Sequence, residues 1–255
     1  MNLGRTLQGP IHYAMSMDTD LLEETANFLV GPGRGILAAD ESNGTMSKRL
    51  EGVGVSSSPE SRNAYRANLF AMPTMPEAIS GVILYDETIR QQAVDGTSIP
   101  DYLHARNVLP GIKVDTGAKP LAGHENETVT EGLDGLRERC AEYFSMGARF
   151  AKWRAVIKIG NGLPSDACIS TNAHALARYA AICQEQGLVP IIEPEVLMEG
   201  DHSAQICFDV TASVLEATWA ACKTQGVHLP GALLKPNMVL PGKAHSERSD
   251  VETCA

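Results

Sequence analysis

A lysine at the end of an apolar run is the first residue of this sequence that could do chemistry. Lys235 follows the small and branched residues 231–234 and precedes Pro236, which has no backbone N–H and therefore stops a strand. Burial disfavours the charged form of an amine, and a neutral lysine can attack a carbonyl to form a Schiff base. Taken alone, the pattern also fits a lysine whose ammonium reaches solvent from a strand end.

Charged residues also stand at or near the ends of four other predicted strands. Successive side chains of a strand alternate between its two faces, so the charged residues within each strand point to the same side. A convergent set of both signs is typical of a functional site. The strands and their charged residues are 35–40 with Asp40, 111–115 with Lys113 and Asp115, 149–157 with Lys152 and Arg154, and 188–195 with Glu193 and Glu195.

The elements that position these residues alternate between strand and helix, which predicts parallel strands joined by right-handed crossovers. In an α/β barrel the carboxyl ends of the strands form the active-site face. Two further strands are predicted, one at 79–85 and one that starts at 231 and ends at Lys235, and helices are predicted at 19–29, 46–50, 131–146, 172–186 and 204–224. We therefore expect a TIM (β/α)8 barrel of which about six β/α units are present.

Five ordered stretches of the chain closely resemble the class I fructose-1,6-bisphosphate aldolase family. They are residues 36–42, 110–115, 150–154, 189–195 and 233–239, and the similarity extends from about residue 21 to 242. The resemblance implies a metal-independent lyase that cleaves fructose 1,6-bisphosphate to dihydroxyacetone phosphate and glyceraldehyde 3-phosphate in glycolysis and gluconeogenesis. It also implies a cytoplasmic homo-oligomer, a homotetramer in this family.

The same resemblance implies a role for each charged residue of the catalytic centre. Lys235 is expected to form the Schiff base, Glu193 to act as its acid and base, and Asp40 to act as the base at the C4 hydroxyl of the substrate. Lys152 is expected to favour the free amine of Lys235 by charge repulsion. Glu195 is expected to hold the two lysines and Glu193 in one hydrogen-bonded network.

One phosphate of the substrate is expected to bind Ser42, Thr45, Lys113 and Arg154, with a contribution from Arg49. A lone helical arginine such as Arg49 also fits a solvated surface charge. Ser42 also fits the N-cap of the following helix, and the capping and phosphate roles can coexist.

Composition excludes several other classes of protein. The net charge of −10 argues against a nucleic-acid partner, and no apolar run reaches the ~20 residues of a membrane span. Six cysteines without a CxxC pair favour reduced thiols, and seven scattered histidines without ligand spacing argue against a metal site. We expect no metal and no cofactor.

The expected organisation is a loose arm at 1–18, the partial barrel at 19–240 and a polar tail at 241–255. Two further β/α units need roughly thirty residues each, whereas about twenty follow Lys235. We expect a fragment of a longer enzyme, or a barrel whose open edge another chain covers. The alternatives are an inactive or non-catalytic barrel fragment and a Schiff-base aldolase for a different sugar phosphate.

Overall fold

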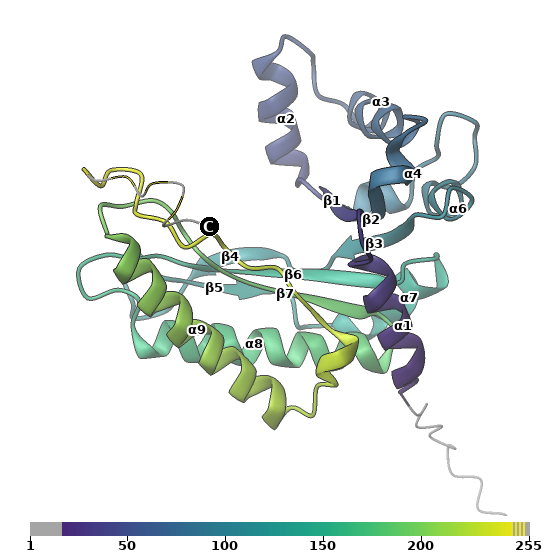
Figure 1. Ribbon diagram of the computed structural model, residues 1–255. Coiled ribbons are helices and arrows are strands. Elements are labelled where there is room, and N and C mark those ends of the chain that lie inside the picture. Colours follow the sequence, from purple (N-terminus) through teal and green to yellow (C-terminus); the bar gives the residue numbers. More distant parts are fainter. Residues whose placement is uncertain (1–16, 247, 249, 251, 253–255) are drawn as a thin grey trace, which may run out of the picture.

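The computed structural model describes residues 17–246, 248, 250 and 252, and its central feature is a curved sheet of six parallel strands (Figure 1). The strand order is β1-β2-β3-β6-β7-β8, with β1 and β8 at the two edges. The strands are β1 (Gly35–Ala39), β2 (Ile79–Leu84), β3 (Leu109–Lys113), β6 (Phe150–Ile157), β7 (Val189–Val196) and β8 (Leu233–Leu234). The predicted count of six barrel strands is confirmed.

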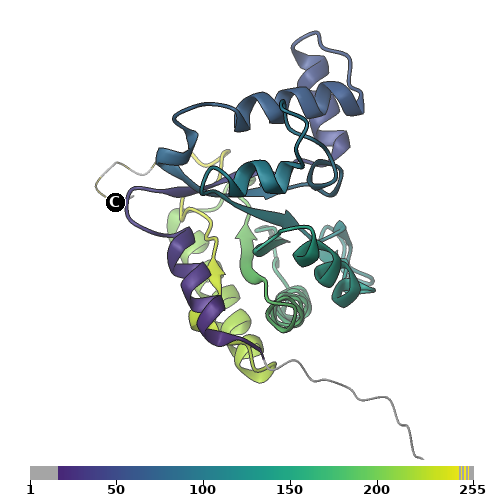
Figure 2. The same cartoon turned by 90° about the vertical axis from the view of Figure 1, so that its right-hand side faces the viewer.

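Helices cover the sheet in two groups. Figures 1 and 2 show α2 to α6 above the sheet and α8 and α9 below it, with α1 beside the β8 edge. The helices are α1 (Thr19–Leu29), α2 (Asn43–Gly52), α3 (Pro59–Phe70), α4 (Met75–Ala78), α5 (Asp86–Ile89), α6 (Ile99–His104), α7 (Leu136–Ser145), α8 (Asp166–Glu185) and α9 (Ala204–Thr224), with a 3₁₀ turn η1 (Leu229–Gly231). None of the helices among the described residues is long and apolar enough to cross a membrane.

The core confirms the predicted faces of β6. Trp153 points away from the barrel interior and stacks on Tyr179 of α8, with ring centroids 5.5 Å apart. The Tyr179 hydroxyl donates to the carbonyls of Ala151 and Ile191, so one buried side chain ties α8 to both β6 and β7. The opposite face of β6 is thereby left for the charged residues.

Several predicted boundaries differ from the structure. The helices predicted at 19–29 and 204–224 are confirmed, whereas the helix predicted at 131–146 starts only at Leu136. Gly132 and Gly135 both have positive φ, which breaks the helix, and the preceding residues form a hairpin of β4 (Gly117–Pro120) and β5 (Thr128–Glu131). The helix predicted from residue 172 begins at Asp166, because Ser165 caps it there.

The strand that precedes Lys235 is shorter and more exposed than predicted. Only Leu233 and Leu234 pair with β7, and Leu234 is 38% exposed. The predicted end of the strand at Lys235 is confirmed, whereas its predicted burial is wrong. An edge strand has a neighbour on one side only, and Pro236 removes an N–H from the ladder directly after the lysine.

The predicted domain limits at 18 and 240 remain a prediction. Residues 1–16 lie outside the described part of the chain. The first residues of the predicted polar tail are attached to the loop after β7: the Gly242 amide donates to the His202 carbonyl, and the Lys243 amide donates to that of Met198.

A buried carboxylate anchors the β4–β5 hairpin to α8. Glu127 accepts hydrogen bonds from the Ser165 backbone N–H at 2.7 Å and from its hydroxyl at 2.5 Å. Burial alone would raise the pKa of Glu127, but the hydrogen bonds from Ser165 outweigh burial and hold that pKa below its usual value. The carboxylate therefore stabilises the fold in its ionised form.

We expect Glu127→Ala to lower the free energy of unfolding by about 1–3 kcal/mol, because two part-buried donors of Ser165 lose their acceptor. The stabilising contribution is present above the unfolded-state pKa of ~4.3 and is lost as the pH falls through the lower folded-state pKa. Urea unfolding at about pH 7 and about pH 3 measures both effects. Glu125→Ala, on the exposed part of the same loop, is the control. Equal effects of the two variants at neutral pH would show that the hydrogen bonds between Glu127 and Ser165 do not stabilise the fold.

Candidate active site

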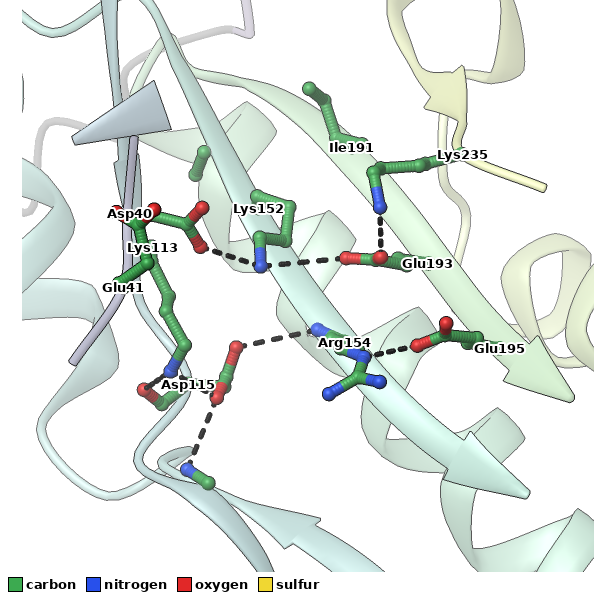
Figure 3. Close-up of polar contacts among 12 residues, drawn as sticks. Asp40, Glu41, Lys113, Asp115, Lys152, Arg154, Ile191, Glu193, Glu195 and Lys235 are labelled. Atoms are coloured by element: carbon green, nitrogen blue, oxygen red, sulfur yellow. Dashed lines mark hydrogen bonds and ion pairs between the residues drawn. The ribbon is translucent and has the colours of Figure 1, made fainter. Parts of the chain in front are cut away.

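Four charged side chains from different strands form a row across the barrel interior (Figure 3). Lys152 Nζ lies 2.7 Å from Asp40 Oδ2 and 3.4 Å from Glu193 Oε2. The other carboxylate oxygen of Glu193 accepts from Lys235 Nζ. Asp40 follows β1 and Lys235 follows β8, while Lys152 and Glu193 lie within β6 and β7. The row alternates in sign, so each buried charge faces an opposite one.

Pairing with two carboxylates keeps Lys152 positively charged despite its burial. Burial would lower its pKa, but Asp40 and Glu193 outweigh burial and raise the pKa above its usual value. Lys152 and Glu193 are both buried, whereas the side chain of Lys235 is 45% exposed. A fixed ammonium therefore lies inside the barrel, and the accessible amine is that of Lys235.

Glu195 does not join the two lysines, so the predicted network is wrong at this residue. Its carboxylate accepts from Arg154 Nε instead. Glu195 is two residues beyond Glu193 on β7, roughly 6.6 Å further along the strand. It therefore lies beyond the lysines and beside the longer arginine (Figure 3).

A cavity of about 540 Å³ opens at the Asp40 end of the row. Such a volume is typical of small-molecule sites. Asp40 and Lys152 line it together with every predicted phosphate ligand: Ser42, Thr45, Arg49, Lys113 and Arg154. Seven of the ten predicted site residues therefore line this cavity. The other three, Glu193, Glu195 and Lys235, adjoin it through their ion pairs.

The N-terminus of α2 faces this cavity. Ser42 caps the helix, because its Oγ accepts from the Thr45 backbone N–H at 3.4 Å, and the predicted capping role is confirmed. A helix N-terminus favours anions, since its first N–H groups point outward and carry partial positive charge. Arg49, in the last turn of α2, pairs with Glu41 at 2.5 Å and keeps 62% of its side chain exposed.

Lys235 lines a second, more apolar cavity of about 320 Å³ between the β1 and β8 edges. Leu29, Ile36, Ile191 and Leu233 are among its walls, and Ala38 lines both cavities. The charged row therefore separates a cation-lined compartment from an apolar one.

Two supporting residues were given no role by the sequence analysis, although Asp115 was among its convergent charges. Asp115, almost fully buried, accepts from Lys113 Nζ at 2.5 Å, from the Gly117 amide at 3.1 Å and from the Arg154 amide at 3.3 Å. Its place on the face of Lys113 was the available sequence signal. Arg66 of α3 had no such signal, because it is remote in sequence and its helix was not predicted.

Arg66 holds the turn after Asp40 from behind. Its guanidinium is completely buried and donates to the Glu41 carbonyl at 2.6 Å and to Thr88 Oγ1 at 2.8 Å. The Glu41 carboxylate lies 3.4 Å away. A helix outside the barrel thus fixes the residue next to Asp40.

Among the described residues, no group of three or more His, Cys, Asp or Glu is placed to hold a metal ion. The cation-lined cavity instead offers lysine, arginine and hydroxyl groups, which suit phosphate oxygens.

Comparison with known proteins gives one consistent family. Residues 21–255 match the family model described as glycolytic fructose-bisphosphate aldolase class-I. The chain is 54% identical to a probable fructose-bisphosphate aldolase class 1 of Xanthomonas campestris pv. campestris, over 94% of this chain and 72% of that protein. It is 53% identical to cytosolic fructose-bisphosphate aldolase 6 of Arabidopsis thaliana, over 88% of this chain and 62% of that protein.

A solved structure agrees. Fructose-bisphosphate aldolase from Plasmodium falciparum, in complex with TRAP and a small-molecule inhibitor, superposes with a TM-score of 0.89 at 46% identity. The match covers 91% of this chain and 67% of that one.

We expect Arg66→Met to lower the free energy of unfolding by about 2–4 kcal/mol, because the Glu41 carbonyl and the buried Thr88 hydroxyl lose their donor. Arg49→Met removes the exposed partner of the Glu41 carboxylate and should cost less than about 1 kcal/mol. Urea unfolding of both variants measures the contrast. Similar losses of unfolding free energy in the two variants would show that the buried Arg66 stabilises the fold no more than the exposed Arg49.

Proposed function

Since this chain belongs to the class I fructose-bisphosphate aldolase family, we propose that Lys235 is the nucleophile of the family's reaction, the reversible cleavage of fructose 1,6-bisphosphate through a lysine Schiff base. The observation that carries this assignment is the contact of an accessible amine with the buried Glu193, which also faces the charged Lys152. An amine nucleophile needs an adjacent group that can take up and return protons, and Glu193 is in place for that task.

In the first half of the reaction the Lys235 nitrogen forms a bond to the ketone carbon of the substrate. Glu193 relays one proton from the amine nitrogen to the ketone oxygen, which gives a carbinolamine. A second proton, taken up from solvent through Glu193, then lets this oxygen leave as water, and an iminium remains. Lys152 contacts the other oxygen of the Glu193 carboxylate and so restrains Glu193 from pairing with Lys235 alone.

In the second half Asp40 takes the proton of the C4 hydroxyl. The electron pair of the C3–C4 bond then moves into the iminium and leaves an enamine, while the released aldehyde is glyceraldehyde 3-phosphate. Protonation of the enamine and hydrolysis of the resulting iminium release dihydroxyacetone phosphate. The Asp40–Lys152 contact at 2.7 Å orients the carboxylate for this step.

One substrate phosphate binds in the cation-lined cavity. Lys113, Arg154 and Arg49 supply positive charge there, and Ser42 and Thr45 supply hydroxyl donors at the start of α2. Membership of the aldolase family supports a sugar bisphosphate as the substrate class. By resemblance we also propose a cytoplasmic homotetramer, which light scattering on the purified protein would test.

Treatment of the chain with dihydroxyacetone phosphate and sodium borohydride should trap the iminium as a stable secondary amine on Lys235. Peptide mass mapping locates the adduct, and Lys235→Met should abolish it. The exposed Lys223 of α9 serves as an internal control that stays unlabelled. An adduct on another lysine, or none, would refute the assignment of Lys235.

Lys152→Ala should slow trapping roughly 10- to 100-fold, because Asp40 and Glu193 lose the ammonium that pairs with both carboxylates. Trapping rates of the variant and of the unaltered protein, both shown to be folded by circular dichroism, measure this. A variant that is trapped at the rate of the unaltered protein would show that Lys152 does not position these carboxylates.

A further inference from the structure

The segment that carries Lys235 has few backbone contacts with the sheet. β8 contains two residues, and the last backbone bond of its ladder runs from the Lys235 N–H to the Ile192 carbonyl at 2.9 Å. Pro236 follows and has no N–H to donate. Residues 234–236 are all exposed, so packing does little to hold them. Contacts other than packing and the backbone ladder must therefore define the position of Lys235.

The edge of β7 that faces β8 supplies the next contact. Backbone groups of a strand alternate between its two neighbours, so Ile192, Pro194 and Val196 all face β8. Pro194 has no N–H, which makes that of Val196 the next available donor. It donates to Asn237 Oδ1 at 3.3 Å. A side chain thus takes the place of the missing backbone acceptor, and Val196, which is buried, keeps a partner.

The same side chain also reaches α9. Asn237 Nδ2 lies 3.2 Å from Thr211 Oγ1 and 3.1 Å from the Met238 carbonyl. Both ends of the amide are therefore used. Asn237 connects the segment after Lys235 to β7 and to the helix behind it.

We propose that Asn237 is a positioning residue for Lys235, an inference that rests on the proposed role of Lys235 as nucleophile. Glu193 and Val196 belong to the same rigid strand, whereas Lys235 and Asn237 are two residues apart on the exposed segment. The bond between Val196 and Asn237 therefore sets the register of the segment against β7. That register determines whether Lys235 Nζ meets the Glu193 carboxylate.

Asn237→Leu and Asn237→Asp separate this role from general stability. Leucine has a similar size but accepts no hydrogen bond, so trapping of dihydroxyacetone phosphate by borohydride should slow roughly 10- to 100-fold. Aspartate can still accept from the Val196 N–H and from the Thr211 hydroxyl, so it should recover most of the rate at its own optimal pH. Hydrogen exchange of 233–240, followed by mass spectrometry, should accelerate at least about tenfold in the leucine variant alone.

Glu127→Ala is the control for lost stability, because it weakens the hairpin anchor and leaves the β7–β8 edge untouched. It should not change the trapping rate. Trapping by Asn237→Leu at the wild-type rate, or unchanged exchange over 233–240, would overturn the inference. Failure of the unaltered protein to be trapped would instead count against the proposed nucleophile, and the exchange measurement would still decide whether Asn237 holds the segment.

Discussion

A buried ammonium at Lys152 is the constraint on which the rest of the site depends. Removing a lysine charge from water costs several kcal/mol unless opposite charges surround it. Asp40 and Glu193 provide those charges from β1 and β7. β1 is separated from β6 by β2 and β3, which in a flat sheet would place the two strands roughly 14 Å apart. Only the curvature of the barrel brings Asp40 to 2.7 Å from Lys152.

The cations of the phosphate compartment already have carboxylate partners. Lys113 pairs with Asp115 and Arg154 with Glu195, while Arg49 pairs with Glu41. A bound phosphate would therefore exchange partners with these carboxylates rather than meet bare charges. Such pairs restrict the side chains before the substrate arrives, which reduces the entropy lost on binding. The clustering of three cations at one cavity lets a chain of net charge −10 present a phosphate site.

The accessible lysine lies where the sheet is least complete. β8 is an edge strand, and the cavity beside Lys235 is bounded by β1 on its far side. The lysine therefore depends on local contacts, the side chain of Glu193 on one side and the backbone of β7 on the other, more than on burial.

The sequence by itself determined which residues share a face and which strands carry charge. Alternation along a strand is a property of the backbone, so the faces of Lys152 with Arg154 and of Glu193 with Glu195 could be predicted without any partner. Only the tertiary structure decided the pairing among them, because reach across a curved sheet depends on strand order and register. Glu195 therefore contacts Arg154 rather than the lysines, and the buried Arg66 supports the turn after Asp40 from a helix that no local pattern connected to it.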